Sequence, residues 1–351
     1  MERLIFVDHL KSSFLNSGSE DISYHQDLFA IYKPFAAQSS DNISKRKRAA
    51  CGDSETELSG EWPLDQDIAD NLKKFVIENS DEFAREVLDD AENSKAKQSA
   101  AVIPSSYFFR GCTYQIFFNE NGKTQKCYFQ NRQFLLPPHS VGILSTLSPS
   151  STIDMLKAAH TLYGSDGRFD LIVMDPPWIN KSVKRQRRYM TADAQDCLSQ
   201  LKIQDLLAYD GLLIVWYTHN ISHYTYLKEQ LSGWNLQLVA TWTWLKVTTN
   251  GTPICPLGRN FKKPYEHVLL ATRNQLYTEK LFKSNGKIIV SVPSAIHSHK
   301  PNLECVLEQF DIHCKRLRCL ELFARTLKSN WVCFGNEVIK LQCVEVFDVL
   351  N

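Results

Sequence analysis

The stretch that decides the fold is Phe169–Trp178, "FDLIVMDPPW", in which a mostly apolar run leads into an acid, two prolines and an indole. A continuous apolar run is typical of a strand in a parallel sheet that is covered on both faces. Proline lacks the N–H that a sheet requires, so the two prolines end the strand. Ligands of open α/β sheets bind outside the carboxyl ends of the strands. The stretch therefore predicts a buried strand that delivers Asp175 to a binding site.

Further apolar runs follow this strand and alternate with stretches of helical spacing. Such alternation is typical of an α/β fold with a mainly parallel sheet. We therefore expect one α/β domain over residues 139–351. Strands are expected at 211–218, 236–247, 266–273, 287–293, 318–325 and 330–335, and helices at 151–164, 191–210, 222–234 and 301–311.

The first 138 residues differ in composition from the rest and are predicted to form a smaller α+β region. Residues 1–40 hold short apolar runs typical of a small ordered element. Residues 41–101 are rich in Ser, Asp, Glu, Lys and Ala, which predicts a charged linker, with an amphipathic helix at 69–91. Residues 102–138 are predicted to be a small β-hairpin region, with "NENGK" at 119–123 as the turn.

Composition and charge exclude several classes of protein. The net charge is +1, so any attraction to nucleic acid has to come from local clusters of basic residues. The ten cysteines form no CxxC pair, which favours buried free thiols in a reducing compartment. A zinc site from His313, Cys314 and Cys319 has a spacing that fits none of the usual patterns, so we expect no metal. No apolar run approaches transmembrane length, and the N-terminus is too short and charged for a signal peptide; we expect an intracellular protein without a membrane partner.

The chemistry of the motif Asp175–Trp178 suits a planar group that carries an NH₂. Its two prolines offer carbonyls but no N–H donors, so the turn presents hydrogen-bond acceptors only. The Asp175 carboxylate and the Pro176 carbonyl could hold the two hydrogens of an adenine amine, with Pro177 stiffening the turn and Trp178 stacking on the base. The electrophile implied is the methyl sulfonium of S-adenosylmethionine. The alternative is a proline pair that only ends a strand.

Four stretches together resemble the adenine-N6 methyltransferase family that has a DPPW motif. They are "FDLIVMDPPW", "KPYEHVLLATR" at 263–273, "HSHKP" at 297–301, and "LELFAR" at 320–325 followed by "NWVCFGNE" at 330–337. The extension "DPPWINKSVKRQRRY" resembles the methyltransferase-like protein 4 branch of that family. The resemblance implies a Rossmann-like methyltransferase fold of permuted, β-class order, in which the catalytic motif precedes most of the cofactor-binding part.

The resemblance also implies which residues bind S-adenosylmethionine. Lys300 would pair with the methionine carboxylate, Phe323 and Arg325 would line the pocket near the cofactor, and Asp175 would also contact the cofactor. Asn336 and Glu337 carry an amide and a carboxylate suited to the ribose hydroxyls. The adenine of the cofactor would lie against the segment that contains Ser145 and Thr146.

A basic segment follows the motif directly and is expected to hold the nucleic acid that carries the target adenine. Lysine and arginine contact phosphates without specifying sequence. Trp244 and Lys246 form a second predicted wall, although alternate residues of a strand face the interior. The alternative for the basic segment is a solvated loop. The residues predicted to bind substrate in that segment are Asn180, Lys181, Ser182, Lys184, Arg185, Arg187, Arg188 and Tyr189.

Three functions compete on this sequence. The first is N6-methylation of adenine in RNA, for which the branch resemblance implies 2′-O-methyladenosine in a small nuclear RNA such as U2. The second is the same reaction on DNA, and the third is a silent nucleic-acid-binding subunit, which the intact Asp175 and Trp178 disfavour. Because one chain holds both the catalytic and the cofactor motifs, we expect activity without an obligate catalytic partner. We expect the nucleus as its location, with the cytosol as an alternative; "KRKR" at 45–48 is either a nuclear localisation signal or a solvated charge cluster.

Overall fold

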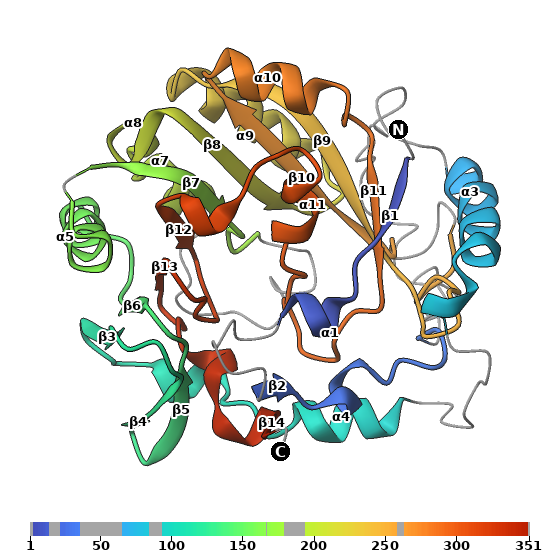
Figure 1. Cartoon of the computed structure of the whole chain (residues 1–351), viewed down its shortest axis with the longest axis horizontal. Coiled ribbons are helices and arrows are strands. Elements are labelled where there is room, and N and C mark those ends of the chain that lie inside the picture. Colours follow the sequence, from blue (N-terminus) through green and yellow to red (C-terminus); the bar gives the residue numbers. More distant parts are fainter. Residues whose placement is uncertain are drawn as a thin grey trace, which may run out of the picture.

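A ten-stranded sheet forms the centre of the computed structural model, which describes residues 3–13, 22–35, 65–83, 93–165, 167–178, 194–257 and 263–349. Its strand order is β1-β11-β9-β10-β8-β7-β12-β13-β6-β3 (Figure 1). The strands are β1 (Leu4–Phe6), β3 (Gln115–Asn119), β6 (Ser140–Leu144), β7 (Phe169–Met174), β8 (Leu207–Tyr217), β9 (Gln237–Lys246), β10 (Tyr265–Thr272), β11 (Ile288–Ser291), β12 (Cys319–Leu322) and β13 (Trp331–Gly335).

The order of the central strands is permuted relative to the chain. Strands β12 and β13 come late in the sequence, yet they lie between β6 and β7 and run parallel to both. Strand β8 runs parallel to β7 on its other side, whereas β10 is antiparallel to both β8 and β9. This large, mostly parallel sheet confirms the predicted Rossmann-like α/β fold.

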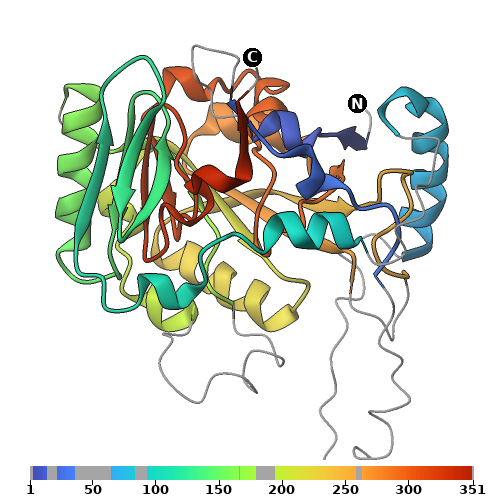
Figure 2. The same cartoon turned by 90° about the horizontal axis from the view of Figure 1, so that it is seen from below.

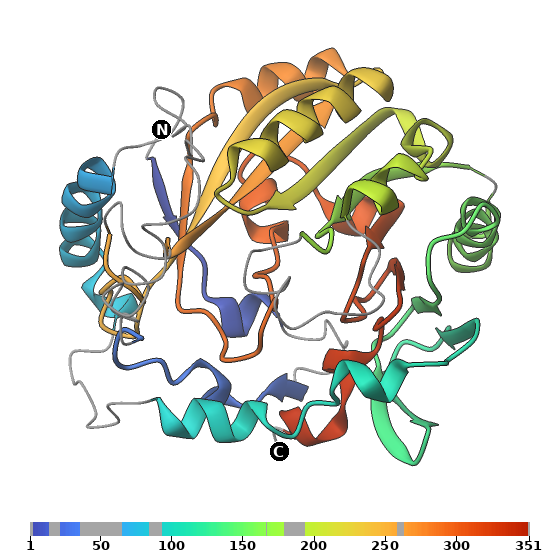
Figure 3. The ribbon, with the colours of Figure 1, turned by 180° about the vertical axis from the view of Figure 1, so that it is seen from behind.

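Helices cover both faces of the sheet, and strand β7 divides its side chains between them. Leu171 and Val173 join one apolar cluster, which includes residues of α10 (Gln275–Phe282) and α11 (Glu304–Glu308). Ile172 and Met174 join the apolar cluster on the opposite face, to which four helices contribute residues: α5 (Ser151–Tyr163), α7 (Ala194–Ser199), α8 (Ile203–Leu206) and α9 (Ile221–Gly233). Figure 1 shows α11 in front of the sheet, and Figure 3, which is seen from behind, shows α9 in front of it. The apolar run of β7 is continuous because both of its faces are buried.

The predicted hairpin with its turn at 119–123 is wrong. Strand β3 pairs antiparallel with β6, while β4 (Gln125–Phe129) pairs with β5 (Arg132–Leu136), so the hairpin lies one strand later. Its two turn residues, Gln130 and Asn131, have φ values of 46° and 65°. A two-residue turn with both residues left-handed matches the twist of paired strands, which explains why this turn prevails.

Two predicted helices are shorter than the sequence indicated. The helix expected at 191–210 is split into α7 and α8, and its last four residues begin strand β8. The helix expected at 301–311 spans only Glu304–Glu308.

The N-terminal segments pack onto the large sheet and onto each other. Strand β1 extends the sheet beside β11, and helix α3 (Asp65–Glu78) buries Leu72 and Phe75 against that end of it. This confirms the predicted helix over 69–78, whereas 79–83 hold a turn and a short 3-10 helix and 84–91 lie outside the described residues. Figure 2 shows α3 at the end of the molecule opposite the β4–β5 hairpin. Strands β1 and β3, which come from the predicted N-terminal region, both belong to the large sheet. The boundaries predicted at residues 40, 101 and 138 stay a prediction.

The remaining elements are short and close the edges of the fold. The remaining elements are α1 (His9–Ser12), β2 (Ile22–Tyr24), η1 (Gln26–Phe29), η2 (Ser80–Glu82), α4 (Ser94–Ala100), η3 (Ser106–Phe109), η4 (Cys314–Arg316), η5 (Lys340–Gln342), η6 (Val344–Val346) and β14 (Phe347–Val349), which pairs with β2.

Within the residues described, the structure contains no helix long and apolar enough to cross a membrane.

Candidate active site

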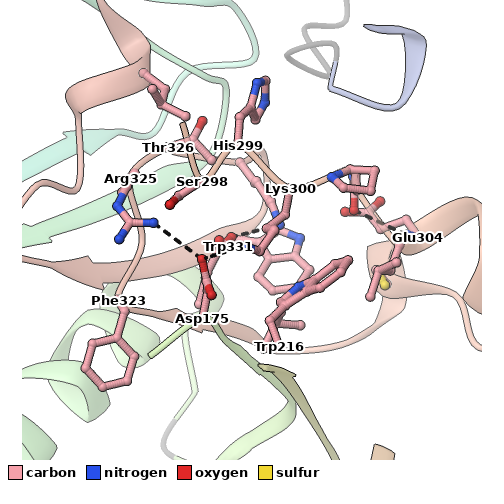
Figure 4. Close-up of a pocket in the computed structure, with 18 of the residues that line it drawn as sticks. Asp175, Trp216, Ser298, His299, Lys300, Glu304, Phe323, Arg325, Thr326 and Trp331 are labelled. Atoms are coloured by element: carbon pink, nitrogen blue, oxygen red, sulfur yellow. Dashed lines mark hydrogen bonds and ion pairs between the residues drawn. The ribbon is translucent and has the colours of Figure 1, made fainter. Parts of the chain in front are cut away.

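A pocket opens at the carboxyl ends of β7 and β12, where the sequence predicted a binding site (Figure 4). Its empty volume, including the mouth that is open to solvent, is ≈ 620 Å³. Its lining includes Asp175, Trp216, Ser298, His299, Lys300, Glu304, Glu321, Phe323, Arg325, Thr326, Lys328 and Trp331.

Asp175 is held between two cations at the end of β7. Its Oδ2 atom lies 3.2 Å from Lys300 Nζ and 3.3 Å from Arg325 Nη1. The two cations approach from opposite sides in Figure 4. Parallel pairing of β7 with β12, in which Met174 faces Leu322, brings Asp175 and Arg325 together across 150 residues of sequence. Three predicted site residues therefore meet at one carboxylate.

Lys300 also binds Glu266, which the sequence analysis missed. The Lys300 Nζ atom lies 2.8 Å from Glu266 Oε2, and Glu266 forms a second ion pair with Lys246. Burial raises the pKa of Glu266, but Lys300 and Lys246 outweigh burial and hold it far below its usual range. Burial lowers the pKa of Lys300, yet Asp175 and Glu266 outweigh that effect and the net shift is upward. Both groups therefore stay charged at neutral pH.

A signal for Glu266 was present in the sequence. It is the acid in "YEHVLLAT", just before a long apolar run. Strand β10 is antiparallel to β8, so its beginning lies at the sheet edge where β7 and β8 end. An acid at the start of an antiparallel strand thus reaches the same edge as an acid at the end of a parallel one. Only the strand direction, which the sequence did not give, connects the two.

The loop after β12 is shaped by backbone strain and close packing. Phe323 has a φ of 59°, a left-handed conformation that is uncommon for a bulky residue and is often found at functional sites. A Cβ atom on Gly335 of β13 would lie 2.4 Å from the carbonyl oxygen of Ala324, so only glycine fits there. The loop is consequently pressed onto β13, and Arg325 is turned toward Asp175.

The predicted cofactor residues fall into two groups. Asp175, Lys300, Phe323 and Arg325 line the pocket. The others follow β6 and β13 at the same sheet edge but lie outside the pocket lining, and their roles stay predictions. Glu337 lies 3.5 Å from Arg325 Nε through its Oε2, which links it to the pocket. The residues in this second group are Ser145, Thr146, Asn336 and Glu337.

The two prolines and Trp178 form a tight, anchored turn. The Pro176 carbonyl accepts a hydrogen bond of 2.8 Å from the backbone N–H of Trp178, which leaves it one further lone pair. The Trp178 indole N–H donates to the Trp216 carbonyl at 2.8 Å, and its ring stacks on His223 with the centroids 4.5 Å apart. These contacts fix the turn. His223 covers one face of this buried indole, and stacking of the ring on a target adenine stays a prediction.

The second predicted substrate wall requires a correction. Trp244 is only 2% exposed, and its indole donates to the Ser291 hydroxyl at 2.7 Å, so it belongs to the core and the predicted substrate contact is wrong. Lys246 is engaged with Glu266 beside the pocket. The basic segment, with Asn180, Lys181, Ser182, Lys184, Arg185, Arg187, Arg188 and Tyr189, lies outside the residues that the structure describes.

An open parallel sheet with a charged pocket at its carboxyl edge defines a Rossmann-like α/β enzyme scaffold. Residues 169–337 match the MT-A70 family model. This part of the chain is therefore similar to the MT-A70 family, in agreement with the resemblance seen in the sequence.

Three similar proteins illustrate the range of this family. The mouse protein named N(6)-adenine-specific methyltransferase METTL4 is 36% identical over 68% of this chain and 50% of its own length. The Cryphonectria parasitica protein named N6-methyladenosine RNA methyltransferase MTA1 is 41% identical over 50% of this chain and 53% of its own length. The Caenorhabditis elegans protein named DNA N6-methyl methyltransferase is 36% identical over 61% of this chain and 56% of its own length. The chain thus spans about half the length of these relatives.

Proposed function

We propose that this chain is an S-adenosylmethionine-dependent methyltransferase that acts on the N6 amine of adenine in nucleic acid. The observation that carries the proposal is the placement of Asp175 inside an MT-A70 domain, at the carboxyl end of β7 and between Lys300 and Arg325. The names of the relatives support this activity for them, on RNA in one and on DNA in another.

The charges of the pocket fit the amino-acid end of S-adenosylmethionine, which carries a carboxylate and an ammonium group. Lys300 and Arg325 would hold the carboxylate, and Asp175 would hold the ammonium. When bound, the cofactor supplies an electrophilic methyl group on a sulfonium centre. Lys300 and Arg325 already lie within 3.3 Å of one carboxylate oxygen, so the pocket is arranged for carboxylate binding before any ligand enters.

The target amine is assigned to acceptors of the same turn. Both cations contact the Oδ2 atom of Asp175, so its Oδ1 atom points in a different direction and can accept from an adenine amine. The Pro176 carbonyl retains a lone pair for the second N–H of that amine. Two fixed acceptors orient the nitrogen lone pair, so the enzyme contributes positioning and electrostatics without a strong base.

The favoured substrate is RNA, in particular 2′-O-methyladenosine in a small nuclear RNA such as U2, with the nucleus as the site of action. Support for RNA comes from the name of the Cryphonectria parasitica relative and from the unpaired adenine that the reaction needs, since single strands expose bases without the cost of flipping. The choice of a small nuclear RNA rests on the resemblance to the methyltransferase-like protein 4 branch, to which the mouse and human relatives belong by name. The alternative is DNA, which the name of the Caenorhabditis elegans relative favours. A silent subunit ranks last because Asp175, Lys300 and Arg325 are all in place.

The test is methyl transfer from labelled S-adenosylmethionine to matched single-stranded RNA and DNA oligonucleotides, with and without a 2′-O-methyl group on the adenosine. We expect transfer to RNA, and faster transfer when the 2′-O-methyl group is present. Preferred transfer to DNA would show that RNA is not the favoured substrate, while the proposed methyl transfer to adenine would stand. If neither polymer is methylated while the protein binds S-adenosylmethionine, the proposed activity is wrong.

A further inference from the structure

An exposed tyrosine of η3 and the arginine that follows η3 form a stacked pair, outside the residues matched by the family model. The Tyr107 side chain is 70% exposed, and the Arg110 guanidinium carbon lies 3.9 Å from the centroid of its ring. A guanidinium over a ring is an attractive contact that holds both groups in a fixed orientation. The pair therefore presents a flat aromatic surface and a positive charge to solvent.

A chain of polar contacts ties this segment to the active-site edge. Ser106 Oγ lies 3.2 Å from Lys340 Nζ, which lies 3.0 Å from Glu337 Oε2. Glu337 pairs with Arg325, and Arg325 contacts Asp175. In Figure 3 the teal turn after α4 accordingly lies beside the red segment near the C-terminus. Ser106, which precedes Tyr107, is thus linked to Asp175 through three side chains. The segment also precedes β3, whose first residue pairs with the last residue of β6, so it lies toward the same edge of the sheet as Asp175.

The segment is also anchored from below. Phe109 is buried, and the Phe108 ring lies 6.0 Å from both the Phe129 and Phe134 rings. Aromatic packing beneath the turn keeps its exposed residues in place before any partner binds. A surface that is already ordered loses little entropy when it binds a ligand.

We propose that Tyr107 and Arg110 form a binding site for a base and phosphate of the nucleic-acid strand, next to the target adenine. Aromatic rings on nucleic-acid-binding surfaces stack on bases of any sequence, and arginine adds contacts to phosphates. The inference rests on the proposed function, because it assumes a nucleic-acid substrate. The cofactor is a less suitable occupant, because Tyr107 is mostly exposed and does not belong to the pocket lining.

The structure offers a matched control at the opposite edge of the sheet. Tyr209 is 72% exposed, and the Arg273 guanidinium carbon lies 5.6 Å from its ring centroid. It stands near the beginning of β8, whereas the active site lies where parallel β7 and β8 end. The two tyrosines share exposure and a cationic neighbour and differ in their distance from the site.

The experiment measures fluorescence anisotropy of labelled single-stranded RNA and DNA oligonucleotides with the whole chain. Tyr107→Ala should weaken binding about tenfold, in line with the loss of one stacked base. Tyr107→Phe, which keeps the ring, and Tyr209→Ala should each stay within about twofold of wild type. Arg110→Gln should reduce the dependence of log affinity on log salt by about one unit, as expected for the loss of one phosphate contact.

Three results would overturn the inference: unchanged binding by Tyr107→Ala, equal weakening by Tyr209→Ala, or a raised KM for S-adenosylmethionine with unchanged nucleic-acid affinity. Circular dichroism and thermal unfolding of each variant separate these results from loss of the fold. Absence of wild-type binding to both polymers would overturn this site and the proposed function together. Wild-type binding and methyl transfer, with unchanged binding by Tyr107→Ala, would overturn this site alone.

Discussion

The carboxyl ends of β7 and β12 and the middle of β9 both carried residues predicted to contact ligand, and the structure treats them in opposite ways. Asp175 and Arg325 lie beyond the last residues of their strands and line the pocket. Trp242 and Trp244 lie within β9, and both indoles are buried, each donating to a serine hydroxyl. Asp175 and Arg325 therefore reach the sheet edge, whereas Trp242 and Trp244 stay covered within β9.

The two regions also differ in how polar groups are satisfied. At the sheet edge, charges neutralise one another in a row that includes Glu266, Lys300, Asp175 and Arg325. In β9 each indole N–H has one neutral partner, and the rest of the ring is packed. Charged pairs can exchange partners with a ligand, but packed rings cannot be uncovered without unfolding. The contrast separates a binding site from a core that has the same aromatic composition.

The strongest test of the contrast is Asp175→Ala. Removing the carboxylate deletes the proposed acceptor of the adenine amine, so we expect kcat for methyl transfer to fall by at least about 100-fold. Asp175 also pairs with Lys300 and Arg325, so the variant should lose some stability, and circular dichroism at the assay temperature checks that it stays folded. Labelled methyl incorporation measures kcat, and Asp210→Ala, which removes an exposed acid of β8, is the control. Activity within tenfold of wild type would show that Asp175 is structural.

The converse prediction concerns Trp244→Ala. Emptying a buried indole site leaves a cavity, so the free energy of unfolding should fall by about 3–5 kcal/mol in urea titrations. Trp244→Phe should recover part of that loss because it keeps most of the apolar volume. Nucleic-acid affinity of the folded fraction should match wild type. A fully stable Trp244→Ala variant that has lost nucleic-acid affinity would show that Trp244 contacts the substrate and does not serve the core.

A smaller effect is expected from Glu266→Gln. Glu266 has a depressed pKa in the folded protein, so its ion pairs stabilise the fold above the ordinary pKa near 4.5 and lose this effect as pH falls below it. At pH 7 the variant should be less stable by about 1.5–3 kcal/mol, since a charged hydrogen-bond partner is lost. Its melting temperature should then fall less than that of wild type on acidification.

Melting temperatures at pH 7 and at a pH between about 3 and 4 provide the measurement for Glu266→Gln. Glu279→Gln, which neutralises an exposed acid of α10, is the control and should follow wild type at both values. Equal acid sensitivity of Glu266→Gln and wild type would mean that Glu266 contributes no pH-dependent stability.

Most strands and helices of the α/β domain followed from hydrophobic pattern. The strand at β7 and the helix at α5 matched the predicted positions, because their burial leaves a continuous or periodic apolar signal. Pairing did not follow, as the misplaced hairpin shows: β3 is β-prone in sequence, but its partner β6 lies beyond the β4–β5 hairpin. Which strand pairs with which depends on packing across the whole sheet.

The site was predicted in part, and for a specific reason. Asp175, Lys300 and Arg325 belong to short motifs that can be recognised in the sequence by their order. In the structure, both cations lie within 3.3 Å of the Asp175 carboxylate. Glu266 was missed because its role depends on the antiparallel direction of β10. Trp244 was assigned wrongly because an aromatic residue in a strand looks the same whether the strand is covered or exposed.

By itself the sequence determined the chemical groups of this protein: an acceptor-only turn after an apolar strand, two cations in motifs far along the chain, and an α/β alternation of elements. Tertiary structure decided which of these groups meet. The late strands β12 and β13 insert between β6 and β7, which puts Arg325 against Asp175. Strand β9 lies between β10 and β11, where Trp244 is buried in the core. The physical reason is that side-chain chemistry is local, whereas burial and contact depend on strand order and direction.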